Sequence, residues 1–159
     1  MFIFDNVFHS DVIDTYKEKI DTHYKYQVSI GSDPEAWWPT RNLVITDDPI
    51  VTHIRNFIES KIRVRLTIDN AEMQTWHNGV WSEMHKHTWN GREHGDYNSL
   101  LYLNDDFQDG EFYTDDVIIK PLKNRLTFFN GRDIMHGVNT VKGANRYTII
   151  CWWKNTKFY

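Results

Sequence analysis

Apolar residues at the start of the chain recur at helical spacing. The period predicts a helix over residues 9–22, with Ser10 or Asp11 as its cap. Its apolar face is formed by Val12, Ile13, Tyr16 and Ile20. The next stretch, residues 23–46, is punctuated by glycine and proline, which predicts a loop with one short strand near residues 43–45.

A second helical stretch comes after two adjacent aspartates. Asp47 or Asp48 can cap it, and Pro49 suits its first turn because proline lacks the N–H that would be unpaired there. The apolar stripe consists of Ile50, His53, Ile54, Phe57 and Ile58. The first part of the chain, about residues 1–62, is therefore predicted to be mainly helical.

From about residue 63 the apolar period changes to two, which is typical of strands. Turn signals such as Asn78-Gly79 and Asn130-Gly131 separate the segments. The predicted strands are residues 63–68, 72–76, 84–88, 97–104, 110–114, 117–120, 125–129, 136–139 and 146–153. Helices followed by many short strands predict an α+β fold, in which about residues 63–159 close into a sandwich or barrel.

Composition narrows the class of protein. A length of 159 residues suits a single domain, residues 1–159, with one core. The net charge of −4 gives no reason to expect a nucleic-acid partner. Cys151 is the only cysteine, so an internal disulfide is excluded, and its apolar neighbours predict a buried thiol. With no signal peptide or membrane span expected, the sequence predicts a cytoplasmic protein.

Three of the eight histidines form a candidate metal site. His85 and His87 are two apart in a predicted strand, so both side chains are expected to leave the same face. His136 opens a later strand and can supply a third ligand. Two histidines in this pattern are more often polar surface than metal ligands, so the hypothesis depends on the residues C-terminal to His136.

Arg146 lies ten residues after His136, at the start of an apolar strand. An arginine that points into a core without a partner is energetically costly. By parity, Arg146 shares a face with Thr148, Ile150 and Trp152. If that face lines the barrel, Arg146 needs an anion, and a carboxylate bound through two hydrogen bonds is its best partner. If the face is the outer one, Arg146 is simply solvated.

Taken together, these segments resemble the prolyl-4-hydroxylase-like branch of the 2-oxoglutarate and iron(II) oxygenases, over roughly residues 72–153. The similar segments, in chain order, are Gln74-Thr75-Trp76, His85-Lys86-His87, Leu101-Tyr102-Leu103-Asn104-Asp105, Asp109-Gly110-Glu111, the stretch from Ile119 to Phe129, His136-Gly137-Val138 and Arg146-Tyr147-Thr148-Ile149. Their order and spacing carry the resemblance. It implies a double-stranded β-helix, a jelly-roll or cupin-like barrel, with the N-terminal helices packed on its outer face.

The resemblance also implies roles for individual residues. His85 and His136 would bind Fe(II), while Arg146 and the hydroxyl of Tyr102 would hold the far carboxylate of 2-oxoglutarate. The implied reaction uses O2 to hydroxylate a substrate C–H bond and decarboxylates 2-oxoglutarate to succinate, with ascorbate as an accessory reductant. The implied substrate is a peptidyl-prolyl group or a small molecule.

One position departs from the family pattern. The family has an aspartate ligand two residues after the first histidine, where this chain has His87. We favour a three-histidine site of His85, His87 and His136, with one negative charge fewer. Two alternatives stay open: Asp96 supplies the carboxylate, or the site is degenerate and the protein is not an active oxygenase.

Other classes of protein compete with this hypothesis. A three-histidine cupin dioxygenase that does not use 2-oxoglutarate fits Gly79 and the histidines after it, but it gives Arg146 no role. A zinc hydrolase could use three histidines and a water, yet no other hydrolytic motif is present. A non-catalytic jelly-roll module could bind a ligand at a rim of aromatic side chains. The candidates for that rim are Trp37, Trp38, Trp81 and Trp89.

Overall fold

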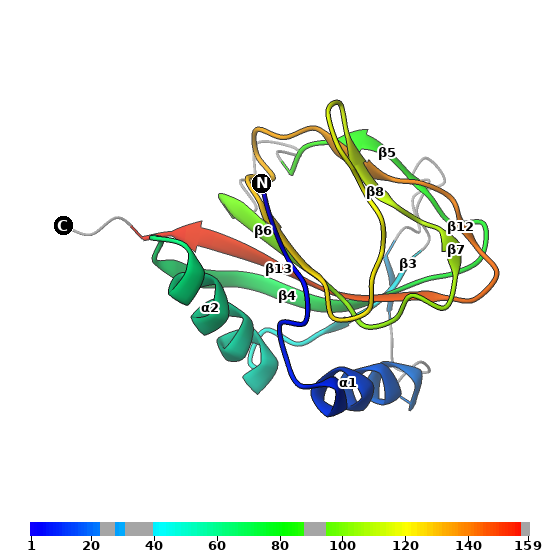
Figure 1. Ribbon diagram of the computed structural model, residues 1–159, viewed down its shortest axis with the longest axis horizontal. Coiled ribbons are helices and arrows are strands. Elements are labelled where there is room, and N and C mark those ends of the chain that lie inside the picture. The colour runs from blue at the N-terminus through cyan, green and yellow to red at the C-terminus, as the bar shows by residue number, and fades with distance from the viewer. Residues whose placement is uncertain (23–27, 31–39, 88–94, 157–159) are drawn as a thin grey trace.

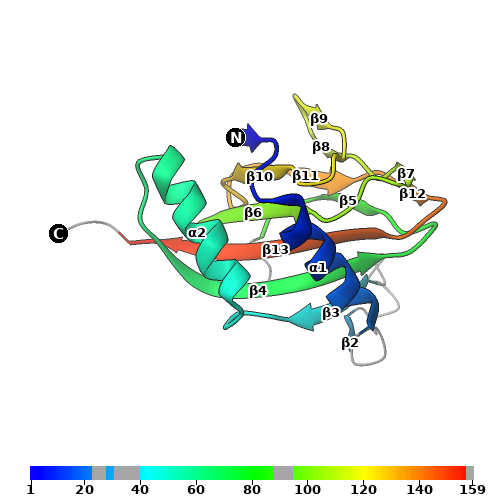
Figure 2. The ribbon, with the colours of Figure 1, turned by 60° about the horizontal axis from the view of Figure 1, so that its bottom comes forward.

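The computed structural model describes residues 1–22, 28–30, 40–87 and 95–156. Within these ranges two sheets face each other, and helices cover the outer face of the larger one (Figures 1 and 2). The helices are α1 (Ser10–Thr22) and α2 (Pro49–Lys61). The strands are β1 (Phe2–Phe4), β2 (Val28–Ile30), β3 (Thr40–Val44), β4 (Leu66–Trp76), β5 (Ser82–His85), β6 (Tyr97–Tyr102), β7 (Gln108–Asp109), β8 (Phe112–Thr114), β9 (Ile118–Ile119), β10 (Leu126–Phe129), β11 (His136–Val138), β12 (Val141–Lys142) and β13 (Arg146–Asn155).

The chain passes back and forth between the two facing sheets, which confirms the predicted double-stranded β-helix. The larger sheet has the order β1-β10-β6-β13-β4-β3-β2, and the smaller has the order β5-β11-β8-β9. All paired strands in both sheets are antiparallel. A short pair, β12 with β7, closes one end of the described barrel. The sequence did not predict β1, β2, β7 or β12.

Both predicted helices are present. The first begins at Ser10, and the second is capped by Asp48, whose side chain accepts a hydrogen bond from the backbone N–H of Ile50. The same carboxylate receives hydrogen bonds from Tyr16 and Lys19 of α1, so it links the two helices. None of the described helices has the length and apolar character required to span a bilayer.

The prediction of two strands over residues 63–68 and 72–76 is wrong, because β4 is continuous. Its pairing with β13 shifts between Trp152 and Trp153, where Asn70 and Ile68 are the partners and Asp69 is left over. This β-bulge exchanges the faces of the strand. Apolar side chains on the outer face therefore have even numbers before the bulge and odd numbers after it, and this change of parity resembles a break between strands in the sequence.

The two faces of the larger sheet have different roles. Its outer face packs against the helices in the main core, where Met73, Cys151 and Trp153 are fully buried against Ile13 and Ile54. The buried state predicted for Cys151 is thus confirmed. The inner face contributes to a smaller apolar cluster, which lies between the two sheets and has buried members from both. Its buried members are Leu100, Tyr102, Phe112, Ile119, Phe129 and Ile150.

Candidate metal centre

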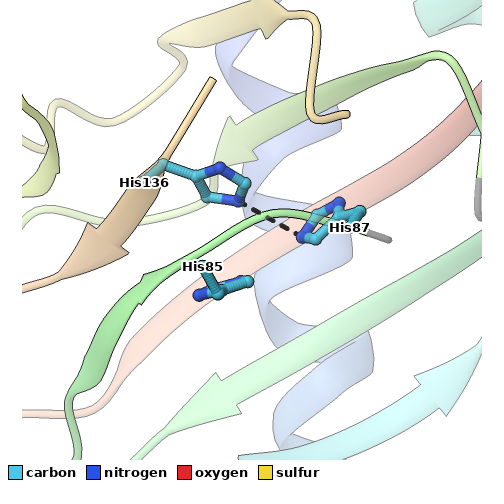
Figure 3. A group of neighbouring side chains, drawn as sticks. All are labelled: His85, His87 and His136. Atoms are coloured by element: carbon cyan, nitrogen blue, oxygen red, sulfur yellow. Dashed lines mark hydrogen bonds between the residues drawn. The ribbon is translucent and has the colours of Figure 1, made fainter. Parts of the chain in front are cut away.

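Three histidine side chains converge between the two sheets. Figure 3 shows His85, His87 and His136 turned toward one another, and one nitrogen from each lies within 4.8 Å of the others. The Nε2 atoms of His87 and His136 are 3.2 Å apart. Two nitrogens that bind one metal at about 2.1 Å each would be separated by about 3 Å. The spacing therefore suits a shared metal ion.

His85 and His136 are positioned by strand pairing, but His87 is not. The residues His85 and His136 are direct partners across β5 and β11. The prediction that residues 84–88 form one strand is wrong, because β5 ends at His85 and His87 lies in a bend beyond it. The backbone N–H of His87 instead donates to the carbonyl of Gly131, over 3.0 Å. The three histidines are therefore brought together by the hydrogen bond between His87 and Gly131 as well as by the pairing of β5 with β11.

The hydrogen bonds of His85 and His136 leave Nε2 ready to bind metal. Nδ1 of His85 lies 2.9 Å from the carbonyl of Glu83, and Nδ1 of His136 lies 2.8 Å from that of Ile134. Because a carbonyl only accepts, each Nδ1 carries the proton and each Nε2 keeps its lone pair. Burial lowers the pKa of both, that of His136 to about 3 with the help of repulsion from the neighbouring histidines. Both rings are thus neutral near pH 7.

His87 receives two contacts that require opposite tautomers. Its Nδ1 lies 2.9 Å from Oδ1 of Asn98, an acceptor, and 3.1 Å from the indole N–H of Trp152, a donor. When Trp152 donates, the proton of His87 is on Nε2 and faces His136. When Nδ1 donates to Asn98, the Nε2 lone pair is available to a metal. Asn98 is therefore the contact that suits metal binding.

Gly131 allows Asn98 to approach His87. A Cβ atom at position 131 would lie 1.8 Å from Oδ1 of Asn98 and 3.2 Å from Nδ1 of His87. Such contacts are impossible without movement of the backbone, so a side chain at this turn would displace the carboxamide. Sequence reasoning missed the contact that Asn98 makes with His87 and the role of Gly131. Asn98 belongs to no recognisable motif, and the sequence marked Gly131 only as part of a turn.

Asp96 is not brought to the three histidines. Its carboxylate accepts a hydrogen bond from Arg132 over 2.9 Å and another from the backbone N–H of Asn155 over 2.8 Å. Among the described residues, the group that could hold a metal consists of His85, His87 and His136. Of the predicted rim aromatics, Trp81 is exposed, whereas Trp37, Trp38 and Trp89 lie outside the described residues.

Arg146 lies on the inner face, with its side chain 1% exposed. None of its three guanidinium nitrogens has a hydrogen-bond partner in the described part of the chain. The guanidinium instead lies over the rings of Trp76 and Tyr102, with Cζ at 5.2 and 5.1 Å from their centroids. Cation–π contacts of this kind offset part of the cost of burial, and burial still lowers the pKa of Arg146.

Two hydroxyl groups beside Arg146 also have no partner among the described residues. These are the hydroxyls of Tyr102 and Thr148, which are paired across β6 and β13 and are both fully buried. Burial raises the pKa of Tyr102, although the charge of Arg146 opposes the shift, so its O–H stays protonated and able to donate. We call Trp76, Tyr102, Arg146 and Thr148 the arginine pocket. Sequence parity placed Thr148 on this face but gave it no role.

The two parts of the inner surface fit a metal and a 2-oxo acid. Imidazole nitrogens suit iron and related divalent metals. The arginine pocket presents a cation and two hydroxyls whose hydrogen bonds are not satisfied, and a carboxylate would satisfy them. The inner surface thus presents two kinds of binding group, one for a metal and one for an anion.

Comparison with known proteins agrees with this chemistry. The sequence profile of the 2OG-Fe(II) oxygenase superfamily matches residues 71–154. Prolyl 3-hydroxylase 2 of Homo sapiens is 32% identical over 99 residues, which cover 57% of this chain. The match spans only 13% of the length of that relative.

Solved structures share the fold over nearly the whole chain. A prolyl-4-hydroxylase of Pseudomonas putida superposes with a TM-score of 0.77 at 15% identity, over 98% of this chain and 92% of the other. A prolyl hydroxylase from Trichoplax adhaerens, in complex with a hypoxia inducible factor oxygen degradation domain peptide fragment, gives 0.75 at 17% identity, over 97% and 83%. The profile match extends over more than half of the 159 residues. The chain therefore belongs to the 2OG-Fe(II) oxygenase superfamily.

Proposed function

We propose that this chain is an Fe(II)- and 2-oxoglutarate-dependent oxygenase that hydroxylates a C–H bond of its substrate and converts 2-oxoglutarate to succinate. The observation that carries the proposal is the buried guanidinium of Arg146, which has no hydrogen-bond partner among the described residues. A buried, unpaired cation is costly, and a carboxylate between the sheets would remove that cost. The buried cation therefore favours an oxygenase that uses a carboxylate co-substrate over a cupin dioxygenase that uses none.

In this proposal His85, His87 and His136 hold the iron, which supplies the activation of O2 that amino-acid side chains cannot provide. Arg146 orients the far carboxylate of 2-oxoglutarate, and the hydroxyls of Tyr102 and Thr148 donate to it. The apolar inner cluster excludes water, which strengthens these contacts. The protein thus contributes position and charge rather than redox chemistry.

The proposed substrate is a residue within a peptide. The names of the relatives support it, since they are prolyl hydroxylases, and one solved neighbour holds a peptide. A free amino acid or another small metabolite is the alternative. A peptide array and a metabolite panel, both assayed by succinate release, separate the two.

The direct test of the proposed activity is turnover. The protein is supplied with Fe(II), 2-oxoglutarate and O2, and succinate is measured. Succinate should form only when both iron and O2 are present. Arg146→Ala should raise the KM for 2-oxoglutarate by about 30-fold or more, because a charge-assisted bidentate contact is lost.

Arg65→Ala removes an exposed arginine that pairs with Glu59 and is the matched control. It should leave the KM unchanged. If Arg146→Ala also leaves the KM unchanged, the role assigned to Arg146 is wrong. If the protein consumes O2 with a substrate while 2-oxoglutarate is absent, the cupin-type reaction replaces the proposed one.

A further inference from the structure

The inner face of the larger sheet carries a polar cluster, with two buried and two half-buried members, that the proposed chemistry does not use. Its members, here called the Glu72 cluster, are Asn42 of β3 and Asn70, Glu72 and Gln74 of β4. Strand pairing puts Glu72 opposite Ile150 and Gln74 opposite Thr148, so the cluster faces the barrel. Glu72 is 7% exposed and Asn42 is 6% exposed.

Neutral amides surround the Glu72 carboxylate. Nδ2 of Asn42 donates to Oε2 over 2.7 Å, and Nδ2 of Asn70 donates to Oε1 over 2.9 Å. Gln74 adds a longer contact of 3.4 Å. No lysine or arginine of the described ranges forms an ion pair with Glu72. The cluster therefore buries a negative charge without a cation, which is energetically unfavourable.

Asn42 adds an acceptor without a partner. Because a carboxylate only accepts, the amide must turn Nδ2 toward Glu72, and this fixes the direction of its Oδ1. That Oδ1 atom is buried and has no hydrogen-bond partner in the parts of the chain that the structure describes. The unfilled position of the Glu72 cluster is thus one acceptor, Oδ1 of Asn42, beside a negative charge. The complementary group is a cationic N–H donor.

The Glu72 cluster lies between the arginine pocket and the metal centre along the sheet. Trp76 of the arginine pocket is four residues from Glu72, or about 13 Å along the strand. In the other direction Asn70 is paired with Trp152, whose indole contacts Nδ1 of His87. Gln74 of the cluster accepts a hydrogen bond from the indole N–H of Trp76 over 3.2 Å and is paired with Thr148, so the cluster also adjoins the arginine pocket. A group held at Glu72 would therefore lie between the metal centre and the arginine pocket.

We propose that Glu72, together with Oδ1 of Asn42, binds a protonated amine or a guanidinium group of the substrate. The proposal rests on the oxygenase function and names its substrate class: a molecule, such as a peptide with a lysine or arginine side chain, that carries an N–H cation near the C–H bond to be hydroxylated. Arg146 selects an anion and Glu72 selects a cation. Opposite charges thus direct the co-substrate and the substrate to different positions on the inner face.

The test uses small probes on the full chain loaded with Fe(II) and 2-oxoglutarate without O2. The probes are n-butylguanidinium, n-butylammonium, n-butyltrimethylammonium, which has a charge but no N–H donor, and neutral n-butanol. Binding is measured by calorimetry, and the visible band of the iron–2-oxoglutarate complex is recorded in the same samples. The first two probes should bind at least tenfold more tightly than the last two, and the better of them identifies the natural group.

Glu72→Gln should weaken the binding of the N–H cations by about tenfold or more, because it removes the charge and keeps the size of the side chain. Glu18→Gln makes the same change on the exposed side of α1 and should have no effect. Equal binding of n-butylguanidinium to wild type and Glu72→Gln would overturn the proposal. So would absence of binding to the wild type.

Failure of this proposal can be separated from failure of the oxygenase function. If the band forms and the cations do not bind, the oxygenase function stands and the cation site is rejected. If the band does not form in the wild type, the oxygenase function fails, and the probes are tested on the metal-free protein. If Glu72→Gln does not fold, the comparison of the four probes on the wild type decides the question.

Discussion

At the residue scale, the surroundings of His87 decide whether three histidines can act as one metal site. His85 and His136 each have Nδ1 tied to a backbone carbonyl, which a mutation elsewhere cannot easily change. His87 is held by two side chains that compete for the same nitrogen. Its readiness to bind metal is therefore set by Asn98 and Trp152.

We predict opposite effects for substitutions of these two residues. Asn98→Ala removes the acceptor for Nδ1–H of His87 and should weaken metal binding by about tenfold, the usual effect of losing such a contact. Trp152→Phe removes the competing donor and should leave metal binding as tight or tighter. Titration with Co(II), followed by its visible spectrum, measures both affinities. Equal weakening by both variants would show that packing, rather than the tautomer, matters.

The low pKa of His136 predicts a loss of stability in mild acid. In the unfolded chain a histidine has a pKa of about 6.5, whereas burial lowers that of His136 to about 3. Between these values the unfolded chain binds a proton that the folded protein does not. The free energy of unfolding of the metal-free protein should therefore decrease as the pH is lowered. Midway between the two pKa values, the decrease should be about 1.4 kcal/mol for each pH unit.

Urea titrations at pH 7, 6 and 5 measure this slope. His136→Gln should make it shallower, while His53→Gln, at an exposed position of α2, should not. The lowered pKa of His85 acts in the same direction, so some slope should persist in His136→Gln. An unchanged slope in that variant would contradict the assignment.

At the element scale, the β-bulge at Asp69 and the cap at Asp48 determine which side chains face the interior of the barrel and how the helices pack on its outer face. The bulge at Asp69 turns Asn70, Glu72, Gln74 and Trp76 toward the barrel, while the helices cover the other face. Asp48 fixes how those helices meet, because it caps α2 and also binds Tyr16 and Lys19 of α1.

We expect Asp48→Ala to lower the free energy of unfolding by about 2 kcal/mol, since the cap and the contacts with α1 are lost together. Asp47→Ala changes the adjacent, exposed aspartate and should alter it by less than about 0.5 kcal/mol. Chemical denaturation of both variants gives the comparison. Similar losses in the two would mean that Asp48 does not act as a cap.

The helices and most strands were predictable because their apolar periods are regular. The sequence also placed Arg146, Thr148, Ile150 and Trp152 on one face, as the pairing of β13 confirms. The bulge was not predictable, since a change of parity and a strand break look alike. The contacts that Nδ1 of His87 makes with Asn98 and Trp152 were missed for a different reason. They join different segments of the chain, so no local sequence pattern indicates them.

At the scale of the whole molecule, the inner face of the barrel contains buried charges that destabilise the ligand-free protein. Arg146 and Glu72 are both buried without an ion-pair partner among the described residues. Functional sites often contain groups that lower the stability of the ligand-free protein, and a bound ligand removes this destabilisation. Stability and ligand binding should therefore respond in opposite directions when Arg146 is replaced.

We predict that Arg146→Met raises the free energy of unfolding of the ligand-free protein by about 1 kcal/mol, because a buried unpaired cation is replaced by an apolar side chain. The same variant should no longer be stabilised by added 2-oxoglutarate. Arg146→Lys keeps the charge and is the matched comparison. Thermal unfolding with and without 2-oxoglutarate measures both effects, and a variant that is less stable than wild type but still stabilised by 2-oxoglutarate would contradict the account.

The central claim is that three histidines and the arginine pocket together hold iron and 2-oxoglutarate without a carboxylate ligand. The most direct measurement is the visible spectrum of the protein under anaerobic conditions, first with Fe(II) and then with 2-oxoglutarate. We expect a weak metal-to-ligand charge-transfer band that appears only when both are present and that needs a much higher concentration of 2-oxoglutarate in Arg146→Ala. Iron that binds without giving this band would show that the three histidines and the arginine pocket do not form one site for iron and 2-oxoglutarate.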